Sequence, residues 1–419
     1  MINTRINHVL SLFDGMSCGQ IALNRIGIKP TKYYASEIDK YAIKITQANY
    51  PDTIQLGDVT QWREWDVDWA SIDLLIGGSP CQGFSFAGNM AGTRATLDGT
   101  DIIVTSREIY LDAKDKGAVF HSQSYLFWEY VLCLDHIKLV NPDIKFMLEN
   151  VKMKKELLQM ISETMCVEPV FINSALVSAQ NRQRYYWASW EIEQPEDKGI
   201  LLADILESEG FGVIKNHGEL KLKNDKSQCI DANYHKGADN HGQRTVILKQ
   251  KPQGNNKGFE KEVSKSPTIS ANSWEHNNHI KTVEFNDRIK GVTENKRGIR
   301  FHKGDAAKSG ISELGRILKT ESEKTDTLTT SHMPKLALNS DVSNLSYRKL
   351  TPIECERLQT VPRNYTDHVS NTQRYKTLGN GWTVDVIAHI FSTMQSAEVF
   401  PIKTEQWDLF EGDLLEVAV

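Results

Sequence analysis

The sequence predicts an α/β fold in which a Rossmann-like, mainly parallel sheet carries a second, smaller and β-rich domain. Short apolar runs at 8–13, 72–76 and 144–148 are typical of strands that are buried on both faces. Between the last two runs, apolar residues recur at helical spacing from 126 to 137 and stop before Pro142. A strand, a helix and a further strand in this order predict a right-handed crossover between parallel strands.

The chain of 419 residues is long enough for two domains, and its character changes along its length. From 191 to 344 it becomes polar, basic and poor in helical faces, which favours a small domain of short strands. We therefore expect residues 1–190 to form the main domain and 191–344 the second domain. Residues 345–400 would return to the main domain, and 401–419 would form a C-terminal tail.

The composition argues against several classes of protein. Hydrophobic residues make up 40% and charged residues 25% of the chain, as in ordinary globular proteins. No apolar run is long enough to cross a membrane and no signal peptide is evident, so we expect a cytoplasmic protein. The six cysteines are scattered without a C-x-x-C pair, which argues against a disulfide framework and against a metal site.

The net charge of −5 is unevenly distributed along the chain. Residues 211–340 hold 23 of the 49 Lys and Arg but only 15 of the 54 Asp and Glu, a surplus of 8. The remaining 26 basic and 39 acidic residues leave the rest of the chain with a deficit of 13. An acidic body with a basic segment suits a protein that meets a phosphate backbone on one side. A merely solvated, lysine-rich segment is the alternative.

Three strand ends near the N-terminus carry glycine or acidic residues. The first strand, 8–13, runs into Asp14-Gly15-Met16-Ser17-Cys18-Gly19 and then a helix, where glycines let the backbone approach a ligand. The dinucleotide pattern G-x-G-x-x-G is absent, which weakens a nicotinamide or flavin function. The strands at 32–36 and 53–56 end in Glu37-Ile38-Asp39 and Gly57-Asp58-Val59. Such acids can accept hydrogen bonds from ribose hydroxyls or cap the next helix.

The strand at 72–76 leads into a turn, Gly78-Ser79-Pro80-Cys81-Gln82-Gly83-Phe84-Ser85. Cys81 therefore follows the carboxyl end of a strand, where open α/β sheets bind ligands, although a free cysteine is more often a core residue. The crossover to 144–148 brings Glu149 beside Cys81 at the same edge of the sheet. By itself, a glutamate at a buried edge is more often a member of an ion pair than a catalytic acid.

Two further segments stand out in the sequence, a long connection at 87–124 and an alternating basic stretch at 180–184. The connection from 87 to 124 is unusually long for a compact domain, which favours a functional or mobile loop, with a short helix at 105–116. Downstream, alternation places Gln180, Arg182 and Arg184 on one face of an extended segment. A basic edge strand that resists aggregation is the alternative.

Regular structure returns towards the C-terminus. Thr351 as N-cap, Pro352 at the first helical position and Glu354 two residues later predict a helix start. The turn Leu378-Gly379-Asn380-Gly381 leads into a final helix with one apolar face. Within 191–344, three similar Ser/Thr-rich stretches are expected to be strands of the small domain; they begin at Ser227, Ser266 and Thr325.

Together these segments resemble the cytosine-C5 DNA methyltransferase family. The resemblance rests on motifs that occur in family order: Phe13-Asp14-Gly15 with Gly19, Ser79-Pro80-Cys81-Gln82, Glu149-Asn150-Val151 and the alternating Gln180, Arg182 and Arg184. It implies a methyltransferase sheet that binds S-adenosyl-L-methionine. It also implies methyl transfer to C5 of a cytosine flipped out of a specific double-stranded DNA sequence, through a covalent Cys81 adduct. Glu149, Arg182 and Arg184 would complete the catalytic group.

The resemblance also implies which residues bind the cofactor and the DNA. S-adenosyl-L-methionine would contact residues at successive strand ends and in the last motif: Phe13, Gly15, Ser17, Cys18, Gly19, Glu37, Ile38, Asp58, Val59, Pro80, Leu126 and Asn380. DNA would contact residues of the catalytic and recognition segments: Gln82, Ser85, Gln180, Thr327 and Leu328. Residues 191–344 would be the target-recognition domain, and the long loop at 87–124 would close over DNA.

Two rival classes share part of this pattern. A transfer-RNA cytosine methyltransferase would have the same catalytic core, but the large basic segment disfavours it. A DNA-binding regulator on an inactive methyltransferase scaffold would need neither Cys81 nor Glu149. We expect a monomer without an obligate protein partner; a restriction endonuclease that acts on the same DNA site is a candidate companion.

Overall fold

The computed structural model describes residues 6–80, 93–207, 211–216, 219–222, 226–236, 244–250, 291–295, 298–302 and 345–394. The chain divides into two compact units. Unit 1 comprises residues 1–173, 183–196 and 382–419, and unit 2 comprises residues 174–182 and 197–381. No helix in the described ranges is long and apolar enough to span a membrane.

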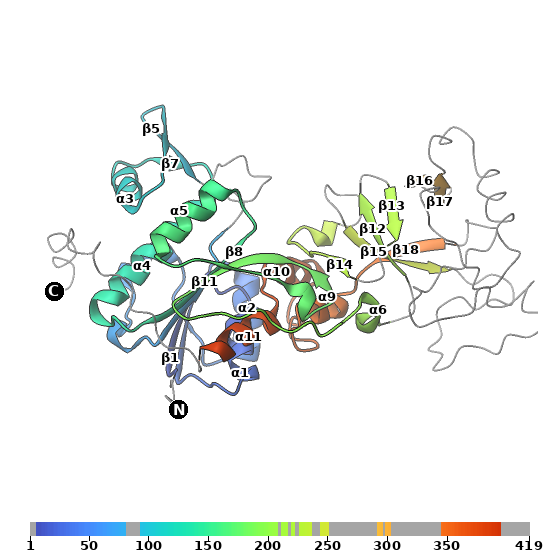
Figure 1. Ribbon diagram of the computed structural model, residues 1–419, viewed down its shortest axis with the longest axis horizontal. Helices are drawn as coiled ribbons and strands as arrows, with labels where there is room; N and C mark the ends of the chain where they lie inside the picture. Colours follow the sequence, from blue (N-terminus) through green and yellow to red (C-terminus); the bar gives the residue numbers. More distant parts are fainter. Residues whose placement is uncertain are drawn as a thin grey trace, which may run out of the picture. The chain divides into compact units, whose positions relative to one another are not determined.

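Unit 1 is built on a seven-stranded sheet in the order β3-β2-β1-β4-β8-β11-β9 (Figure 1). Its strands are β1 (His8–Leu12), β2 (Lys32–Ser36), β3 (Ile54–Gln55), β4 (Leu74–Gly77), β8 (Lys145–Val151), β9 (Val170–Asn173) and β11 (Gln183–Ala188). The first five in this order pair in parallel, and β11 is antiparallel to both of its neighbours. The strand order reverses between β1 and β4, so the carboxyl ends of these two strands flank the switch point at which open α/β sheets bind ligands.

In the described ranges, the helices of unit 1 include α1 (Cys18–Arg25), α2 (Lys40–Asn49), α4 (Leu126–Val140), α5 (Lys155–Met165) and α11 (Val384–Thr393). Helix α11 lies beside α1 (Figure 1), and an ion pair between Arg25 and Asp385 joins them. Helix α1 also approaches the sheet closely at Gly19. A Cβ at this position would lie 2.5 Å from Ile76 Cδ1 and 2.7 Å from Tyr33 Oη, so any side chain here would force one of these two side chains to shift.

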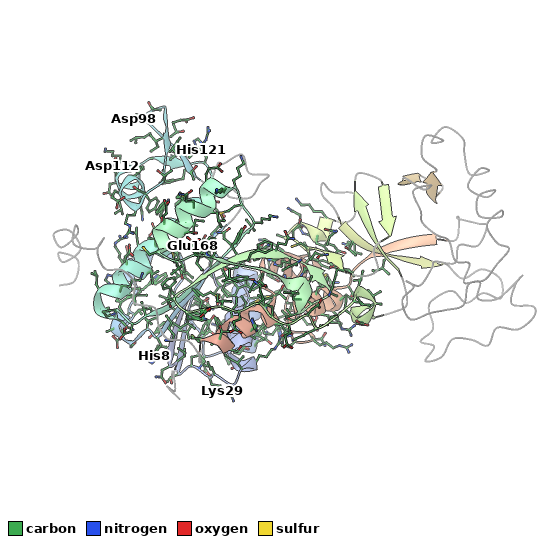
Figure 2. All side chains as sticks on the ribbon, in the orientation of Figure 1. His8, Lys29, Asp98, Asp112, His121 and Glu168 are labelled. Atoms are coloured by element: carbon green, nitrogen blue, oxygen red, sulfur yellow. The ribbon has the colours of Figure 1, made fainter. Side chains whose placement is uncertain are left out.

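The described part of the long connection after β4 is an ordered substructure, which we call the insert (residues 93–125). It contains a three-stranded sheet of β5 (Arg94–Leu97), β6 (Thr100–Ile103) and β7 (Val119–Phe120), together with helix α3 (Arg107–Asp115). The sequence predicts a helix at 105–116, and α3 confirms it. Figure 2 shows Asp98, Asp112 and His121 on the insert, at the opposite end of unit 1 from His8 and Lys29.

Unit 2 is rich in strands, as the sequence predicts. An antiparallel sheet has the order β13-β12-β15-β18, formed by β12 (Phe211–Asn216), β13 (Glu219–Leu222), β15 (Arg244–Gln250) and β18 (Leu345–Lys349). Two further strand pairs are β10 (Gln180–Asn181) with β14 (Ser227–Gln228) and β16 (Gly291–Asn295) with β17 (Gly298–His302). Its helices in the described ranges include α6 (Leu202–Ile205), the 3₁₀-helix η6 (Tyr234–Lys236), α9 (Pro352–Leu358) and α10 (Asn371–Asn380).

The chain returns from unit 2 to unit 1 at Trp382, whereas the sequence suggested a return at 345. The reason is tertiary pairing: β18 bonds to β15, and α10 packs against η6. At Gly379 of α10, a Cβ would lie 2.0 Å from the carbonyl carbon of Asp231, so the helix fits only without a side chain there. The start of α9 is as predicted, with a reciprocal capping box between Thr351 and Glu354.

Candidate active site

The loop after β1 and the end of β2 are joined by the carboxylate of Glu37. Its Oε2 accepts a hydrogen bond from the Gly15 backbone N–H at 2.8 Å, and its Oε1 accepts from the N–H groups of Ile38 and Asp39, both at 2.8 Å. The neighbouring Asp39 caps α2 by accepting from Tyr41 N–H at 2.9 Å. Of the two acids at this strand end, Asp39 is therefore the helix cap, and Glu37 orients the glycine loop.

This glycine loop has left-handed backbone at alternate positions, with φ of 58° at Phe13, 61° at Gly15 and 61° at Ser17. The buried carboxylate of Asp14 stabilises this loop by accepting hydrogen bonds from the hydroxyls of Ser17 and Tyr33. Burial raises the pKa of Asp14 from 3.8 to about 6, although these hydrogen bonds oppose the shift. The loop is thus held open, with no atom within 4 Å of the position that a Gly15 side chain would take.

A second acid, Asp58, follows the end of β3. Asp58 caps the 3₁₀-helix η1 (Val59–Glu64) by accepting from the N–H and the hydroxyl of Thr60, both at 2.9 Å. Burial, and then the nearby Asp58 carboxylate, raise the pKa of Tyr125, which directly precedes Leu126 of α4. At the end of β2, Ile38 leaves 68% of its surface exposed.

Glu149 lies at the carboxyl edge of the sheet, near the end of β8. Its Oε1 forms an ion pair with Arg184 Nε at 2.7 Å, and its Oε2 accepts a hydrogen bond from the Trp382 indole N–H at 3.2 Å. Arg184 comes from β11, which runs antiparallel beside β8. The Glu149 side chain is 10% exposed. The Glu149 carboxylate is therefore oriented by two donors and keeps a small part of its surface exposed to solvent.

The backbone that follows β4 packs directly against this carboxylate. A Cβ at Gly78 would lie 2.9 Å from Glu149 Oε2 and 2.9 Å from Trp382 Nε1. At the next residue, Ser79 Oγ accepts a hydrogen bond from Asn150 Nδ2 at 3.1 Å, which fixes the turn. The side chain of Glu149 therefore lies beside the segment 78–80. Cys81 follows this segment in sequence and lies outside the described residues.

The alternating arginine motif is divided between two sheets, which corrects the expectation of one continuous extended face. Strand β10 ends at Asn181 and belongs to unit 2, whereas β11 begins at Gln183 and belongs to unit 1. In unit 2, the Arg182 guanidinium donates to the carbonyls of Ile230, Gly379 and Gly381 at 3.2, 3.3 and 2.8 Å. Arg182 is only 4% exposed, so its observed contacts are those of a residue that holds backbone together.

Gln180 is also buried, with no exposed surface, and the DNA contact expected of it stays a prediction. Its Oε1 accepts from Ile230 N–H at 2.8 Å, and its Nε2 donates to Gln359 Oε1 at 3.3 Å. Asn380, expected at the cofactor, is the exposed last residue of α10 in unit 2. The DNA-contact predictions for Gln82, Ser85, Thr327 and Leu328 lie outside the described residues.

Three residues with clear roles at this edge were missed from the sequence: Trp382, Asn150 and Asp14. For Asn150, the available signal in the sequence is a polar residue directly after the expected glutamate. Asp14 lies between Phe13 and Gly15, and a buried acid within a glycine turn was the signal there. Trp382 is 233 residues from Glu149 along the chain, and no local pattern links the two.

This sheet order, with an antiparallel β11 next to β8 and polar residues at successive strand ends, defines a Rossmann-like methyltransferase fold. Residues 7–105 and 112–396 match the C-5 cytosine-specific DNA methylase family. Since these ranges cover most of the chain, the protein belongs to this family and is a DNA cytosine-5-methyltransferase.

The chain is similar over most of its length to several bacterial and phage proteins. The orphan methyltransferase M.SPRI of Bacillus phage SPR is 25% identical over 454 residues, which cover 92% of this chain and 97% of that protein. The type II methyltransferase M1.ScrFI of Lactococcus lactis subsp. cremoris is 26% identical over 387 residues, which cover 92% of this chain and 77% of that protein. Among solved structures, the S. pombe Dnmt2 methyltransferase gives a TM-score of 0.49 at 13% identity, covering 93% of this chain and 98% of that one.

Proposed function

We propose that this enzyme transfers a methyl group from S-adenosyl-L-methionine to C5 of a cytosine flipped out of double-stranded DNA, through a covalent adduct with Cys81. The observation that carries the proposal is the Glu149 carboxylate. It is held by Arg184 and Trp382 at the carboxyl edge of the sheet, beside the backbone that leads to Cys81. A protein that only binds DNA would not need an oriented, nearly buried carboxylate at this position.

The first three strand ends fit S-adenosyl-L-methionine. Glu37 Oε2 has one donor among the described residues, so it can still accept a hydrogen bond from a ribose hydroxyl. The exposed side chain of Ile38 offers an apolar face for the adenine ring, and Asp58 offers an acceptor for the adenine amino group. Phe13 presents an aromatic face suited to a sulfonium cation. When bound there, the cofactor supplies an electrophilic methyl group.

The chemistry follows from the low reactivity of cytosine C5. The Cys81 thiolate forms a bond to C6, and the electron pair of the C5–C6 double bond becomes available at C5. Glu149 in its protonated form gives its proton to N3, which has only a lone pair in cytosine, and so neutralises the negative charge that develops on the ring; Arg184 adds positive charge on the same side. The electron pair at C5 would form the bond from C5 to the methyl group as the bond from the methyl group to the cofactor sulfur breaks. A base would then remove the C5 proton, the returning electron pair would expel the Cys81 thiolate, and the N3 proton would return to Glu149. Arg182 is left out of this group because its guanidinium bonds backbone carbonyls within unit 2.

Access to the ring requires that the cytosine leaves the base stack, at a cost of about a few kcal/mol. We propose that the basic segment at 211–340 contributes phosphate contacts, and that residues 191–344 select the target sequence. The relatives include both an orphan and a type II methyltransferase. We propose that this chain catalyses methyl transfer as a monomer, with or without an endonuclease that acts on the same site.

The test is bisulfite sequencing of DNA from a methylation-free host that expresses the chain. We expect protected cytosines at one position of a short recurring sequence, and none in a host that expresses Cys81→Ser. Purified wild-type enzyme should also form a covalent complex with DNA that carries 5-fluorocytosine at the target, because fluorine cannot leave C5 as a proton does. Equal protection by Cys81→Ser would refute the proposed nucleophile.

A further inference from the structure

We infer that Trp382 is a positioning residue for the reaction, whose indole N–H holds the Glu149 carboxyl group in the orientation needed to give a proton to cytosine N3. The inference rests on the proposed role of Glu149 and extends it to a residue near the other end of the chain. It starts from the two donors on that carboxylate, which are the Arg184 Nε–H on Oε1 and the Trp382 Nε1–H on Oε2.

One donor alone would leave the carboxylate poorly oriented. The last torsion of a glutamate side chain is broad, so an ion pair to one oxygen still allows the group to turn about its final bond. A second donor on the other oxygen removes this freedom and fixes the plane of the carboxylate. Each oxygen has one donor among the described residues, which leaves lone pairs that can carry the proton to be given to cytosine N3.

The indole is suited to this task because it only donates. Trp382 is neutral and has no acceptor on its ring, so it orients the carboxylate without exchanging a proton with it. The hydrogen bond between Trp382 and Glu149 also depends on the neighbouring backbone, because Gly78 has no side chain that would push the two groups apart. A Cβ at Gly78 would come within 2.9 Å of both Glu149 Oε2 and Trp382 Nε1.

Trp382 is anchored at its backbone as well as at its ring. Its carbonyl oxygen accepts a hydrogen bond from the Cys18 thiol, with 3.7 Å between Sγ and the oxygen. Cys18 is the first residue of α1 and directly follows the glycine loop. The residue lies two positions before α11, which packs beside α1. The same residue therefore connects the loop proposed to hold the cofactor with the carboxylate proposed to bind the base.

The experiment compares Trp382→Phe with the matched variant Trp190→Phe. Trp190 is also nearly buried in unit 1, and its indole N–H donates to the Ile390 carbonyl at 3.1 Å, so both variants lose one indole hydrogen bond and keep a ring. The readouts are the single-turnover methylation rate at saturating cofactor, the rate of adduct formation on 5-fluorocytosine DNA, cofactor affinity by calorimetry, and the melting temperature.

We expect Trp382→Phe to slow methylation and adduct formation by about 10-fold, with cofactor affinity changed by less than about twofold. We expect Trp190→Phe to methylate at the wild-type rate. Gly78→Ala should reproduce the slow methylation of Trp382→Phe, since its methyl group would displace the same hydrogen bond. In a Glu149→Ala background, Trp382→Phe should have no further effect on the rate, because the group that it positions is gone.

Two outcomes would overturn the inference. One is a wild-type rate for Trp382→Phe, and the other is the same 10-fold loss with and without Glu149. A Glu149→Ala enzyme at the wild-type rate would instead remove Glu149 from the proposed mechanism, which is a distinguishable result.

Discussion

Two buried glutamates of unit 1, Glu149 and Glu129, each form an ion pair and accept a hydrogen bond from an indole N–H. They differ in the number of hydrogen-bond donors that surround the carboxylate. Glu129 is fully buried: its Oε1 accepts from the Tyr110 hydroxyl and from Lys114 Nζ, both at 2.5 Å, and its Oε2 accepts from Trp62 Nε1 at 3.0 Å. Glu149 has fewer donors among the described residues and remains 10% exposed. A carboxylate surrounded by donors serves the fold, and one with spare acceptor capacity at a strand end can serve a reaction.

These three hydrogen bonds of Glu129 join separate elements of unit 1. It lies in α4 and joins two other elements to this helix, which are α3 of the insert through Tyr110 and Lys114 and the 3₁₀-helix η1 through Trp62. A second ion pair, Arg107 Nη1 to Asp135 Oδ2 at 2.6 Å, also joins α3 to α4. The described part of the long connection is therefore docked on unit 1. Its role as a lid over DNA, expected from the sequence, stays a prediction.

The largest expected effect comes from Glu129→Ala. This change leaves the Trp62 N–H, the Tyr110 hydroxyl and the Lys114 ammonium without their shared acceptor. Loss of one partner from a buried charge pair typically costs about 3–5 kcal/mol. Urea unfolding should show a loss of this order, whereas Glu163→Ala on the exposed side of α5 should change stability by less than about 0.5 kcal/mol. A loss below about 1 kcal/mol for Glu129→Ala would contradict the role assigned to it.

A second prediction concerns Asp14, a buried carboxylate whose hydrogen-bond partners among the described residues are hydroxyl groups. Because burial raises the pKa of Asp14 from 3.8 to about 6, the folded protein binds the proton more tightly than the unfolded chain between these values. The free energy of unfolding should therefore fall as pH rises from about 4 to 6, by at most about 1.4 kcal/mol per pH unit from this group. Asp14→Asn should make that part of the pH profile flatter. An unchanged profile, measured by urea unfolding at several pH values, would show that Asp14 titrates normally.

A smaller and more specific effect is expected from Glu37→Ala. It removes the acceptor of the Gly15 N–H and the proposed ribose contact, so cofactor affinity should weaken by about 1–3 kcal/mol. Asp39→Ala is the matched control, because it removes a helix cap two residues away and should lower stability by about 1 kcal/mol without changing cofactor affinity. Calorimetry that shows equal affinities for Glu37→Ala and the wild type would exclude this residue from the cofactor site.

The parts of the site that could be predicted are those that follow from local patterns. Buried apolar runs with polar ends identified the strands, and parallel crossover placed Glu149 at the edge shared with the segment before Cys81. The failures came where the chain changes partners. Alternation puts Gln180, Arg182 and Arg184 on one face only if one strand continues through them. In the structure, β10 pairs with β14, and β11 pairs with β8 and β9.

Long-range pairing also explains why the sequence predicts neither the place of residues 345–381 in unit 2 nor the hydrogen bond of Trp382 to Glu149. Hydrogen bonding of β18 to β15 keeps this segment in unit 2, and pairing between strands so far apart in sequence leaves no local signal. The bond from Trp382 to Glu149 depends on Gly78, a position that sequence alone marks only as part of a turn.

The most direct test of the contrast between the two glutamates is the methyl-transfer rate of Glu149→Gln, measured with its free energy of unfolding. The substitution keeps the shape of the side chain and removes its charge. We expect methyl transfer to fall by about 10²–10³-fold, as when a preorganised stabilising group is lost from an active site. The loss of stability should be smaller than for Glu129→Ala, because glutamine keeps the volume of the side chain and one oxygen that can accept a hydrogen bond. A wild-type methylation rate, or a loss of stability as large as that expected for Glu129→Ala, would contradict the catalytic role of Glu149.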